Sequence, residues 1–335
     1  MTLLALDIGG ANLKIADGNG FARTEPFALW RYPANLASAI EQLITKAPSA
    51  ERFAVTMTGE LADCFTSKEE GVCHILDAVD AVADNRPVQA YLSNGLFVDT
   101  TTARHQPLLA AASNWHALAT FASGFLQSPS GWLIDVGSTT TDLIPIASGG
   151  PTTSATTDLE RLAAGQLVYT GTSRSPICAL VQELPWRGQT IPIAQELFST
   201  TLDVYLLTGE IPEDSNHFQT ADGRPATLTA ARDRLARSVC ADRTMFSDDD
   251  ALTAAREVRQ QQVRLLAHKI RQLFSQQDNF CPEIILSGSG EFLIRAAVDE
   301  LGLSPNLASL AEQIGPLSST CAAAHAVAVL AHEGT

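Results

Sequence analysis

The residues of this chain that could do chemistry lie first of all in two similar segments. In each, an apolar stretch ends in an aspartate and enters a turn of glycine and small polar residues before a second apolar stretch. The aspartates are Asp7 and Asp135, and the turns are loop one (9–12) and loop two (137–140). Such a hairpin can present backbone N–H groups and hydroxyls to phosphate oxygens, and its aspartate can hold Mg²⁺ through water. We predict two phosphate-binding loops with one magnesium ion between Asp7 and Asp135.

A third segment, 283–292, is a predicted strand that enters a Gly-Ser-Gly turn before a helix. Glycines in such a turn let a ligand or another backbone come close, and the helix N-terminus favours an anion. The predicted phosphate-binding residues of the three segments are Asp7, Gly9, Gly10, Asn12, Lys14, Gly137, Ser138, Thr139, Thr140, Gly288, Ser289 and Gly290. For Lys14, a strand-edge lysine without a ligand is an equally good interpretation.

Three acidic residues are candidates for a catalytic role. Glu60 and Asp63 follow the carboxyl end of a predicted strand, the side on which α/β proteins hold ligands. Asp203 lies in a long middle segment. Glu60 could equally cap the helix that follows it. We expect one of these carboxylates to act as a general base.

Two arginines and an aspartate of the same middle segment are candidates for substrate binding. They are Arg174, Asp222 and Arg224. The planar fork of an arginine side chain is suited to a carboxylate of the substrate. Asp222-Gly223 is also an ordinary turn dipeptide, so loop structure is an equally good interpretation.

Composition limits the class of protein. The 335 residues suit two domains, and 45% hydrophobic with 18% charged residues indicates a globular chain. The net charge of −15 would repel nucleic acid and anionic membrane. No apolar stretch reaches the roughly 20 residues of a membrane span, and no leader pattern opens the chain. We expect a cytoplasmic protein that binds neither nucleic acid nor membrane; homodimer formation is left open. The cysteine spacing does not predict zinc.

Alternating strands and helices must position these loops. Strands are expected at 3–6, 13–16, 52–56, 88–92, 132–135, 142–146 and 284–286, and helices at 36–46, 71–82, 114–125, 252–274, from 291 onward, and at 320–332. Small residues let helices approach closely, so the alanine-rich helices 114–125 and 320–332 are expected to cross as a hinge; simple core packing is the alternative. Segment 158–245 is predicted as an insertion without a counterpart in the first half.

The order of the three segments resembles the actin, sugar-kinase and Hsp70 superfamily, where they are phosphate loop one, phosphate loop two and the adenosine loop. The alternative is three unrelated strand-to-turn transitions. The resemblance implies an α/β fold of two ribonuclease-H-like domains around a cleft. The first domain would be 1–126 with the C-terminal helix 319–335. The second would be 127–318, with the insertion and an adenosine-type loop at 287–290.

Several further stretches are similar to hydantoinase A/oxoprolinase-related proteins linked to tetrahydromethanopterin-dependent C1 transfer. They are 58–63, 112–119, 169–176, 201–210, 220–226 and 234–242. Relatives of this group form the ether of methanofuran, joining an aminomethylfuran-methyl diphosphate to a tyramine- or tyrosine-derived phenol with release of diphosphate. The resemblance therefore implies a transferase that displaces diphosphate, uses Mg²⁺, and binds a small-molecule diphosphate and a phenolic acceptor.

Other functions stay open. An ATP-dependent small-molecule kinase or a hydantoinase-type enzyme of the same superfamily needs the same phosphate clamp, so the loops do not choose between the reactions. ATP is not favoured as a cofactor. A nucleotide-binding regulator and a scaffold for a C1-transfer complex are further alternatives. No sugar-binding signature accompanies the loops, which weighs against carbohydrate phosphorylation.

Overall fold

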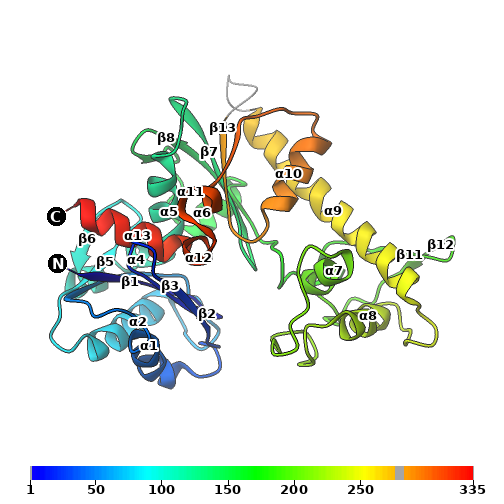
Figure 1. The fold of residues 1–335 in the computed structure, drawn as a ribbon, viewed down its shortest axis with the longest axis horizontal. Coiled ribbons are helices and arrows are strands. Elements are labelled where there is room, and N and C mark those ends of the chain that lie inside the picture. Colours follow the sequence, from blue (N-terminus) through cyan, green and yellow to red (C-terminus); the bar gives the residue numbers. More distant parts are fainter. Residues whose placement is uncertain (1, 276–282, 335) are drawn as a thin grey trace.

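Two mixed β-sheets built on one plan form the frame of the computed structural model, which describes residues 2–275 and 283–334 (Figure 1). The strand order is β3-β2-β1-β4-β5-β6 in the first sheet and β10-β8-β7-β13-β14 in the second. In each sheet an antiparallel hairpin, β1–β2 or β7–β8, is followed by a strand parallel to its first member, β4 or β13. This duplicated arrangement confirms the expected α/β fold.

The first half alternates strands and helices as predicted, with one additional edge strand on each side. It contains β1 (Leu3–Ile8), β2 (Asn12–Ala16), β3 (Ala22–Pro26), α1 (Leu36–Ile44), β4 (Arg52–Met57), α2 (Lys68–Ala83), β5 (Val88–Tyr91), β6 (Phe97–Asp99), α3 (Thr100–His105), α4 (Pro107–Ala110) and α5 (Asn114–Ser123). A 3₁₀ turn at Pro33–Asn35 precedes α1. Every residue of β1 is buried, as a strand covered on both faces requires.

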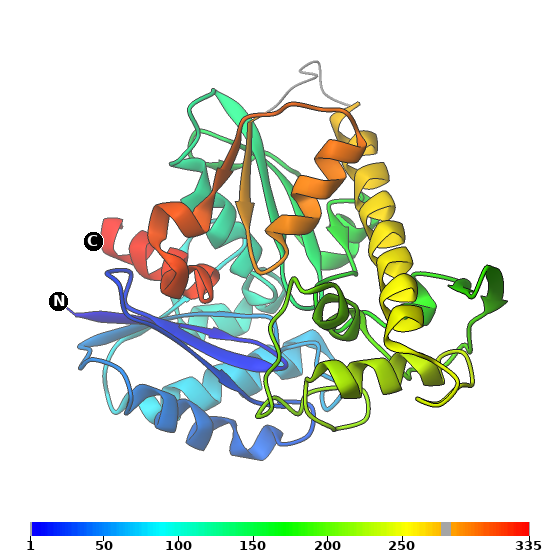
Figure 2. The same ribbon diagram turned by 45° about the vertical axis from the view of Figure 1, so that its right-hand side comes forward.

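The second half repeats the hairpin and then carries the long middle segment. It contains β7 (Ser130–Val136), β8 (Thr141–Ala147), β9 (Gly150–Pro151), α6 (Asp158–Ala163), β10 (Leu167–Val168), β11 (Glu183–Trp186), β12 (Gln189–Pro192), α7 (Thr201–Thr208), α8 (Leu228–Arg237), α9 (Asp248–Phe274), β13 (Glu283–Ser287), α10 (Glu291–Glu300), β14 (Leu307–Ser309), α11 (Leu310–Ile314), α12 (Pro316–Ser319) and α13 (Ala322–Glu333). A 3₁₀ turn lies at Ile177–Ala179. Helices α9 and α10 lie side by side (Figures 1 and 2), and α7 and α8 pack on α9.

The structure corrects the prediction that 158–245 has no counterpart in the first half. Strand β10 pairs with β8 at the edge of the second sheet, in the place that β3 takes beside β2 in the first. A strand of two residues shows no alternation that a sequence pattern could detect. Helix α9 also begins four residues before the predicted start, because Ser247 caps it by accepting a hydrogen bond from the Asp250 N–H.

Helices α5 and α13 cross between the two sheets. Helix α5 packs on the second sheet and α13 on the first, and the two helices contact each other. Ala322 and Ala326 of α13 share one buried cluster with Trp115 and Ala122 of α5. The predicted crossing of two alanine-rich helices is therefore confirmed, while the hinge role and the domain boundaries stay predictions. Among the described helices, none is both long and apolar enough for a membrane crossing.

Ala326→Leu should force α5 and α13 apart. Ala326 is fully buried in the cluster with Trp115 and Ala122, so a larger side chain overpacks the crossing and should lower the free energy of unfolding by about 1–3 kcal/mol. Ala81→Leu on the exposed side of α2 is the matched control and should change it by less than about 0.5 kcal/mol. Urea denaturation measures both, and equal effects would contradict close packing at the crossing.

Candidate functional site

Loop one and loop two close their hairpins in the same way. The Gly9 N–H donates to the Asn12 carbonyl at 3.0 Å, and the Gly137 N–H donates to the Thr140 carbonyl at 2.9 Å. A Cβ on Gly9 would lie only 2.9 Å from the Asn12 carbonyl oxygen. The other predicted residues of these turns are Gly10, Ser138 and Thr139. The structure thus confirms two equivalent turns, while phosphate binding stays a prediction.

The structure brings together Asp7, Lys14 and Asp135 at the base of the two hairpins. Lys14 lies opposite Asp7 in the β1–β2 register, with Nζ 3.6 Å from Oδ2 of Asp7. Burial raises the pKa of Asp7, although Lys14 lowers it. Burial lowers the pKa of Lys14, whereas interactions with Asp7, Cys321 and Asp135 raise it. Together these interactions outweigh burial, so the pKa of Lys14 is raised overall. One ammonium group therefore interacts with carboxylates from both hairpins.

Asp135 is the counterpart of Asp7 in the second hairpin. Its pKa is raised to about 6, first by burial and then by the nearby carboxylate of Asp142, while Lys14 lowers it. Asp7 also raises this pKa, so the two aspartates are close enough to repel each other.

One oxygen atom of Asp7 is available for the expected magnesium ion. Oδ1 of Asp7 is buried and has no hydrogen-bond partner within the described ranges. Among the same residues, no group of three histidine, cysteine, aspartate or glutamate side chains is arranged to hold a metal. An ion held between Asp7 and Asp135 would therefore take most of its ligands from water and from a bound anion, as hydrated Mg²⁺ does.

A segment after β10 covers loop two. The Thr172 N–H donates to the Gly137 carbonyl at 3.0 Å, and the Arg174 N–H donates to the Ser138 carbonyl at 2.9 Å. Gly171 lies so close that a Cβ there would be 2.5 Å from the Gly137 carbonyl oxygen. The predicted substrate residue Arg174 is therefore held directly on loop two by its backbone.

The Gly-Ser-Gly turn also lies against the second hairpin. A Cβ on Gly288 would be 2.3 Å from the Val136 carbonyl oxygen, and the Gly290 N–H donates to that same oxygen at 3.1 Å. Oγ of Ser289 is 2.9 Å from Oγ1 of Thr172. The glycines are thus required by a close backbone approach, as predicted.

Glu60 is buried between the two halves of the molecule. Its side chain is 1% exposed, and Oε1 lies 3.5 Å from Nζ of Lys68. Lys68 on α2 also pairs with Asp158 on α6 of the other half at 3.5 Å. Burial raises the pKa of Glu60 to about 7, although Lys68 lowers it, and Oε2 has no hydrogen-bond partner in the described part of the chain. A Cβ on Gly71 would lie 2.1 Å from the Glu60 carbonyl oxygen, so the glycine inside α2 makes room for this residue.

Ion pairs continue from Asp158 to the second hairpin. Arg161 contacts Asp158 at 3.5 Å and also pairs with Asp142, which lies opposite Asp135 in the β7–β8 register. The guanidinium of Arg161 is buried over the ring of Trp115, with Cζ 4.3 Å from its centroid. Sequence reasoning missed this chain of charges, because no local pattern relates its members. Asp63, by contrast, is exposed and lies outside it.

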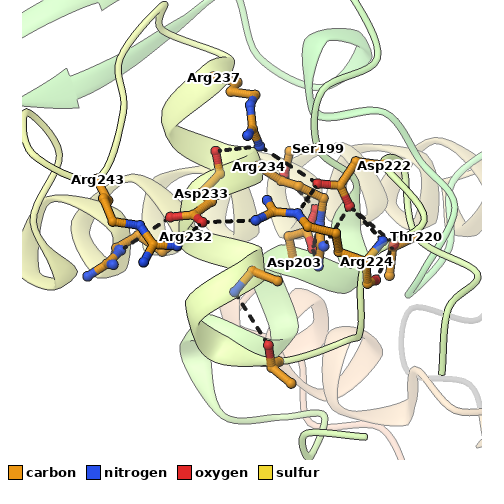
Figure 3. A network of polar contacts seen from close by, with 12 residues as sticks. Ser199, Asp203, Thr220, Asp222, Arg224, Arg232, Asp233, Arg234, Arg237 and Arg243 are labelled. Atoms are coloured by element: carbon orange, nitrogen blue, oxygen red, sulfur yellow. Dashed lines mark hydrogen bonds and ion pairs between the residues drawn. The ribbon is translucent and has the colours of Figure 1, made fainter. Parts of the chain in front are cut away.

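Charged residues of α7, of α8 and of the segment between them pair with one another (Figure 3). Arg234 is fully buried and donates to Asp203 through Nε at 2.8 Å and Nη2 at 2.7 Å. Arg224 pairs with Asp222 at 2.6 Å and with Asp233 at 3.0 Å. These contacts show that Asp203, Asp222 and Arg224 have partners within the protein, while their predicted roles in catalysis and substrate binding stay predictions. Their charges already have partners, so the geometry gives those roles no support.

The chain is similar to known proteins over most of its length. The hydantoinase/oxoprolinase family pattern matches residues 52–333. The (4-{4-[2-(gamma-L-glutamylamino)ethyl]phenoxymethyl}furan-2-yl)methanamine synthase of Methanocaldococcus jannaschii is 33% identical over 331 residues, which cover 98% of this chain and 97% of the relative. The synthase of the same name from Methanococcus vannielii is 30% identical over 200 residues, 59% of this chain and 89% of the relative.

Solved structures show the fold. Nucleotide-free acetone carboxylase matches with a TM-score of 0.54 and 10% identity over 98% of this chain and 70% of that chain. An archaeal actin homologue in complex with ADP matches with a TM-score of 0.46 and 14% identity over 99% of this chain and 100% of the homologue. The match to acetone carboxylase, with a TM-score above 0.5, shows a shared fold.

Glu60→Gln should change how stability depends on pH. The pKa of Glu60 is about 7 in the folded protein against an ordinary 4.5, so between these values the folded state keeps a proton that the unfolded chain has released. The wild type should therefore lose up to about 3 kcal/mol relative to Glu60→Gln as the pH rises from about 5 to about 8. Urea denaturation at several pH values measures the difference. Glu69→Gln, at an exposed position of α2, should show no such trend, and a flat difference for Glu60→Gln would contradict the raised pKa.

Asp203→Ala tests whether the insertion network is structural. The change leaves the buried charge of Arg234 without its main partner and should cost about 3–5 kcal/mol of unfolding free energy. Asp248→Ala is the control, because Asp248 pairs with Arg232 but is 85% exposed; it should cost less than about 1 kcal/mol. Thermal and urea denaturation compare them. Equal losses would mean that Asp203 contributes little to the fold and is available for another role.

Proposed function

The chain belongs to the hydantoinase/oxoprolinase family, and from that premise we propose that it is a synthase of a methanofuran-type C1 carrier, joining a furan-methyl diphosphate to a phenol. The observation that carries the proposal is the 33% identity with the methanamine synthase over nearly the whole of both chains. The name of that relative describes a product in which a phenoxymethyl group is attached to a furan ring. We propose an ether of the same kind as the product of this chain.

Formation of this ether is a substitution at carbon. A bond forms between the phenol oxygen and the furan-methyl carbon while the bond from that carbon to the diphosphate oxygen breaks. The diphosphate leaves with the bonding electrons, and the phenol proton passes to a base. Because the furan ring stabilises positive charge on the methylene, the step depends mainly on binding the leaving anion and excluding water.

The two loops are suited to hold the leaving diphosphate. We propose that backbone N–H groups of loops one and two and the ammonium of Lys14 bind its oxygens. Asp7 and Asp135 would hold Mg²⁺ through water, and the ion would neutralise part of the diphosphate charge. The orphaned Oδ1 of Asp7 supports this assignment, since a buried carboxylate oxygen requires a partner.

Glu60 is the proposed general base. Its carboxylate has one oxygen near Lys68 and one without a partner within the described segments. The raised pKa of about 7 lies close to neutral pH, where a base is most effective. Lys68 would hold the carboxylate in place as it takes the phenol proton.

The alternative is ATP-dependent transfer of a phosphoryl group. The glycine turn 288–290 supports it, since its backbone lies on β7 as the resemblance to an adenosine loop suggests. The two reactions differ in their products: the ether synthase releases diphosphate and consumes no ATP, whereas the kinase forms ADP.

The decisive experiment mixes the purified protein with Mg²⁺, aminomethylfuran-methyl diphosphate and a tyramine-derived phenol. We expect the ether and diphosphate in equal amounts by mass spectrometry, and a rate at least about 100-fold lower for Glu60→Gln. The wild-type rate should rise with pH through about 7, where Glu60 loses its proton. Formation of ADP from ATP with no ether would favour the kinase.

Asp135→Asn and Asp7→Asn should weaken binding of magnesium diphosphate. Each removes a negative charge at nearly constant size, so we expect at least about tenfold lower affinity for the complex with an unchanged circular dichroism spectrum. Asp299→Asn, exposed on α10, is the matched control. Calorimetry with Mg²⁺ measures the affinities, and wild-type binding by Asp135→Asn would remove this aspartate from the metal site.

A further inference from the structure

A second loop lies on loop one, just as residues 172–174 lie on loop two. The Phe27 N–H donates to the Ala11 carbonyl at 2.9 Å, and the Leu29 N–H donates to the Gly10 carbonyl at 3.0 Å. Trp30 follows directly. The position of its backbone is therefore fixed relative to loop one.

Arg174 is fixed in the same way on the other hairpin. The N–H groups of Ser173 and Arg174 both donate to the Ser138 carbonyl, at 3.0 and 2.9 Å. Each loop thus carries one neighbouring segment, held by main-chain hydrogen bonds that do not depend on the side chains at Trp30 or Arg174.

The side chains of Trp30 and Arg174 meet between the two halves. Cζ of Arg174 lies 5.3 Å from the centroid of the Trp30 ring. Trp30 is 40% exposed, and Arg174 is exposed as well. Within the described ranges, no carboxylate forms an ion pair with Arg174. A cation without an acidic partner and a partly open aromatic face are therefore held together, each beside one of the predicted phosphate-binding loops.

An incoming diphosphate would change this pair. At an exposed site an arginine over an aromatic ring is held only weakly, whereas an arginine bound to phosphate forms two parallel charge-assisted hydrogen bonds. The guanidinium would therefore move to the anion and uncover the face of the Trp30 ring. That face is flat and favours positive charge, as the observed contact with Arg174 illustrates.

We infer that Trp30 and Arg174 form the subsite for the aromatic diphosphate substrate, with Arg174 on the diphosphate and Trp30 stacked on the furan ring. The inference rests on the proposed function and adds the residues that select an aromatic diphosphate. Stacked there, the tryptophan face would also stabilise the positive charge that develops on the methylene as its bond to diphosphate breaks.

Binding of two probes, inorganic diphosphate and furfuryl diphosphate, with Mg²⁺ tests the subsite by calorimetry without turnover. The wild type should prefer the furfuryl compound by about three- to tenfold, the range of an aromatic stack. Trp30→Ala should lose this preference while inorganic diphosphate still binds, and Trp30→Phe should keep part of it. Arg174→Ala should weaken both probes about tenfold.

A matched control is present in the β11–β12 hairpin. There the guanidinium of Arg187 lies 5.0 Å from the centroid of the Trp186 ring in a contact that is not attached to either loop, and Arg187 also pairs with Asp250. Trp186→Ala and Arg187→Ala should leave both affinities unchanged. Matching losses in these variants would show a general effect of removing such pairs and would overturn the subsite.

The remaining outcomes separate the two proposals. If the wild type forms the ether but Trp30→Ala keeps the full preference for furfuryl diphosphate, the subsite is wrong and the proposed function stands. If Trp30→Ala weakens both probes equally, Trp30 serves loop one and not the furan, which also overturns the subsite. If the wild type binds neither diphosphate, both proposals fail.

Discussion

Buried negative charge at the base of the two hairpins is the constraint on which the rest of the site depends. Asp7 and Asp135 end the central strands of the two sheets, and burial raises the pKa of both. Lys14 interacts with both carboxylates and supplies one positive charge for the two. Like charges buried near each other are unfavourable unless a cation compensates them or one of them takes up a proton. A divalent ion that arrives with an anionic substrate would complete that compensation.

Close backbone approaches fix the shape around these charges before any ligand binds. Gly171 and Gly288 lie where a Cβ would collide with the second hairpin, and main-chain hydrogen bonds hold residues 172–174 on loop two. A site whose donors are already in place loses less conformational entropy on binding. Because these glycines have no side chain, backbone atoms can lie directly beside the second hairpin.

Ion pairs link the two halves close to the same place. Lys68 joins Glu60 of the first half to Asp158 of the second, and Arg161 extends the contacts to Asp142 beside Asp135. Relative movement of the halves would therefore change the surroundings of the proposed base and of the proposed metal ligand together. Helices α5 and α13 contact each other between the two sheets and form a further link between the halves.

By itself, the sequence determined the two hairpins, the glycine turn and the alanine-rich crossing helices, because each is a local pattern of strand, turn or helix residues. It also indicated Glu60, which directly follows a strand. Contacts between residues distant in sequence were decided only by the tertiary structure. The structure shows that Lys68, Arg161 and Trp30 each contact a residue of the other half. The pattern likewise could not distinguish Arg174, which has no acidic partner in the described ranges, from Arg224, whose charge Asp222 and Asp233 already neutralise, since a polar segment has the same composition in either case.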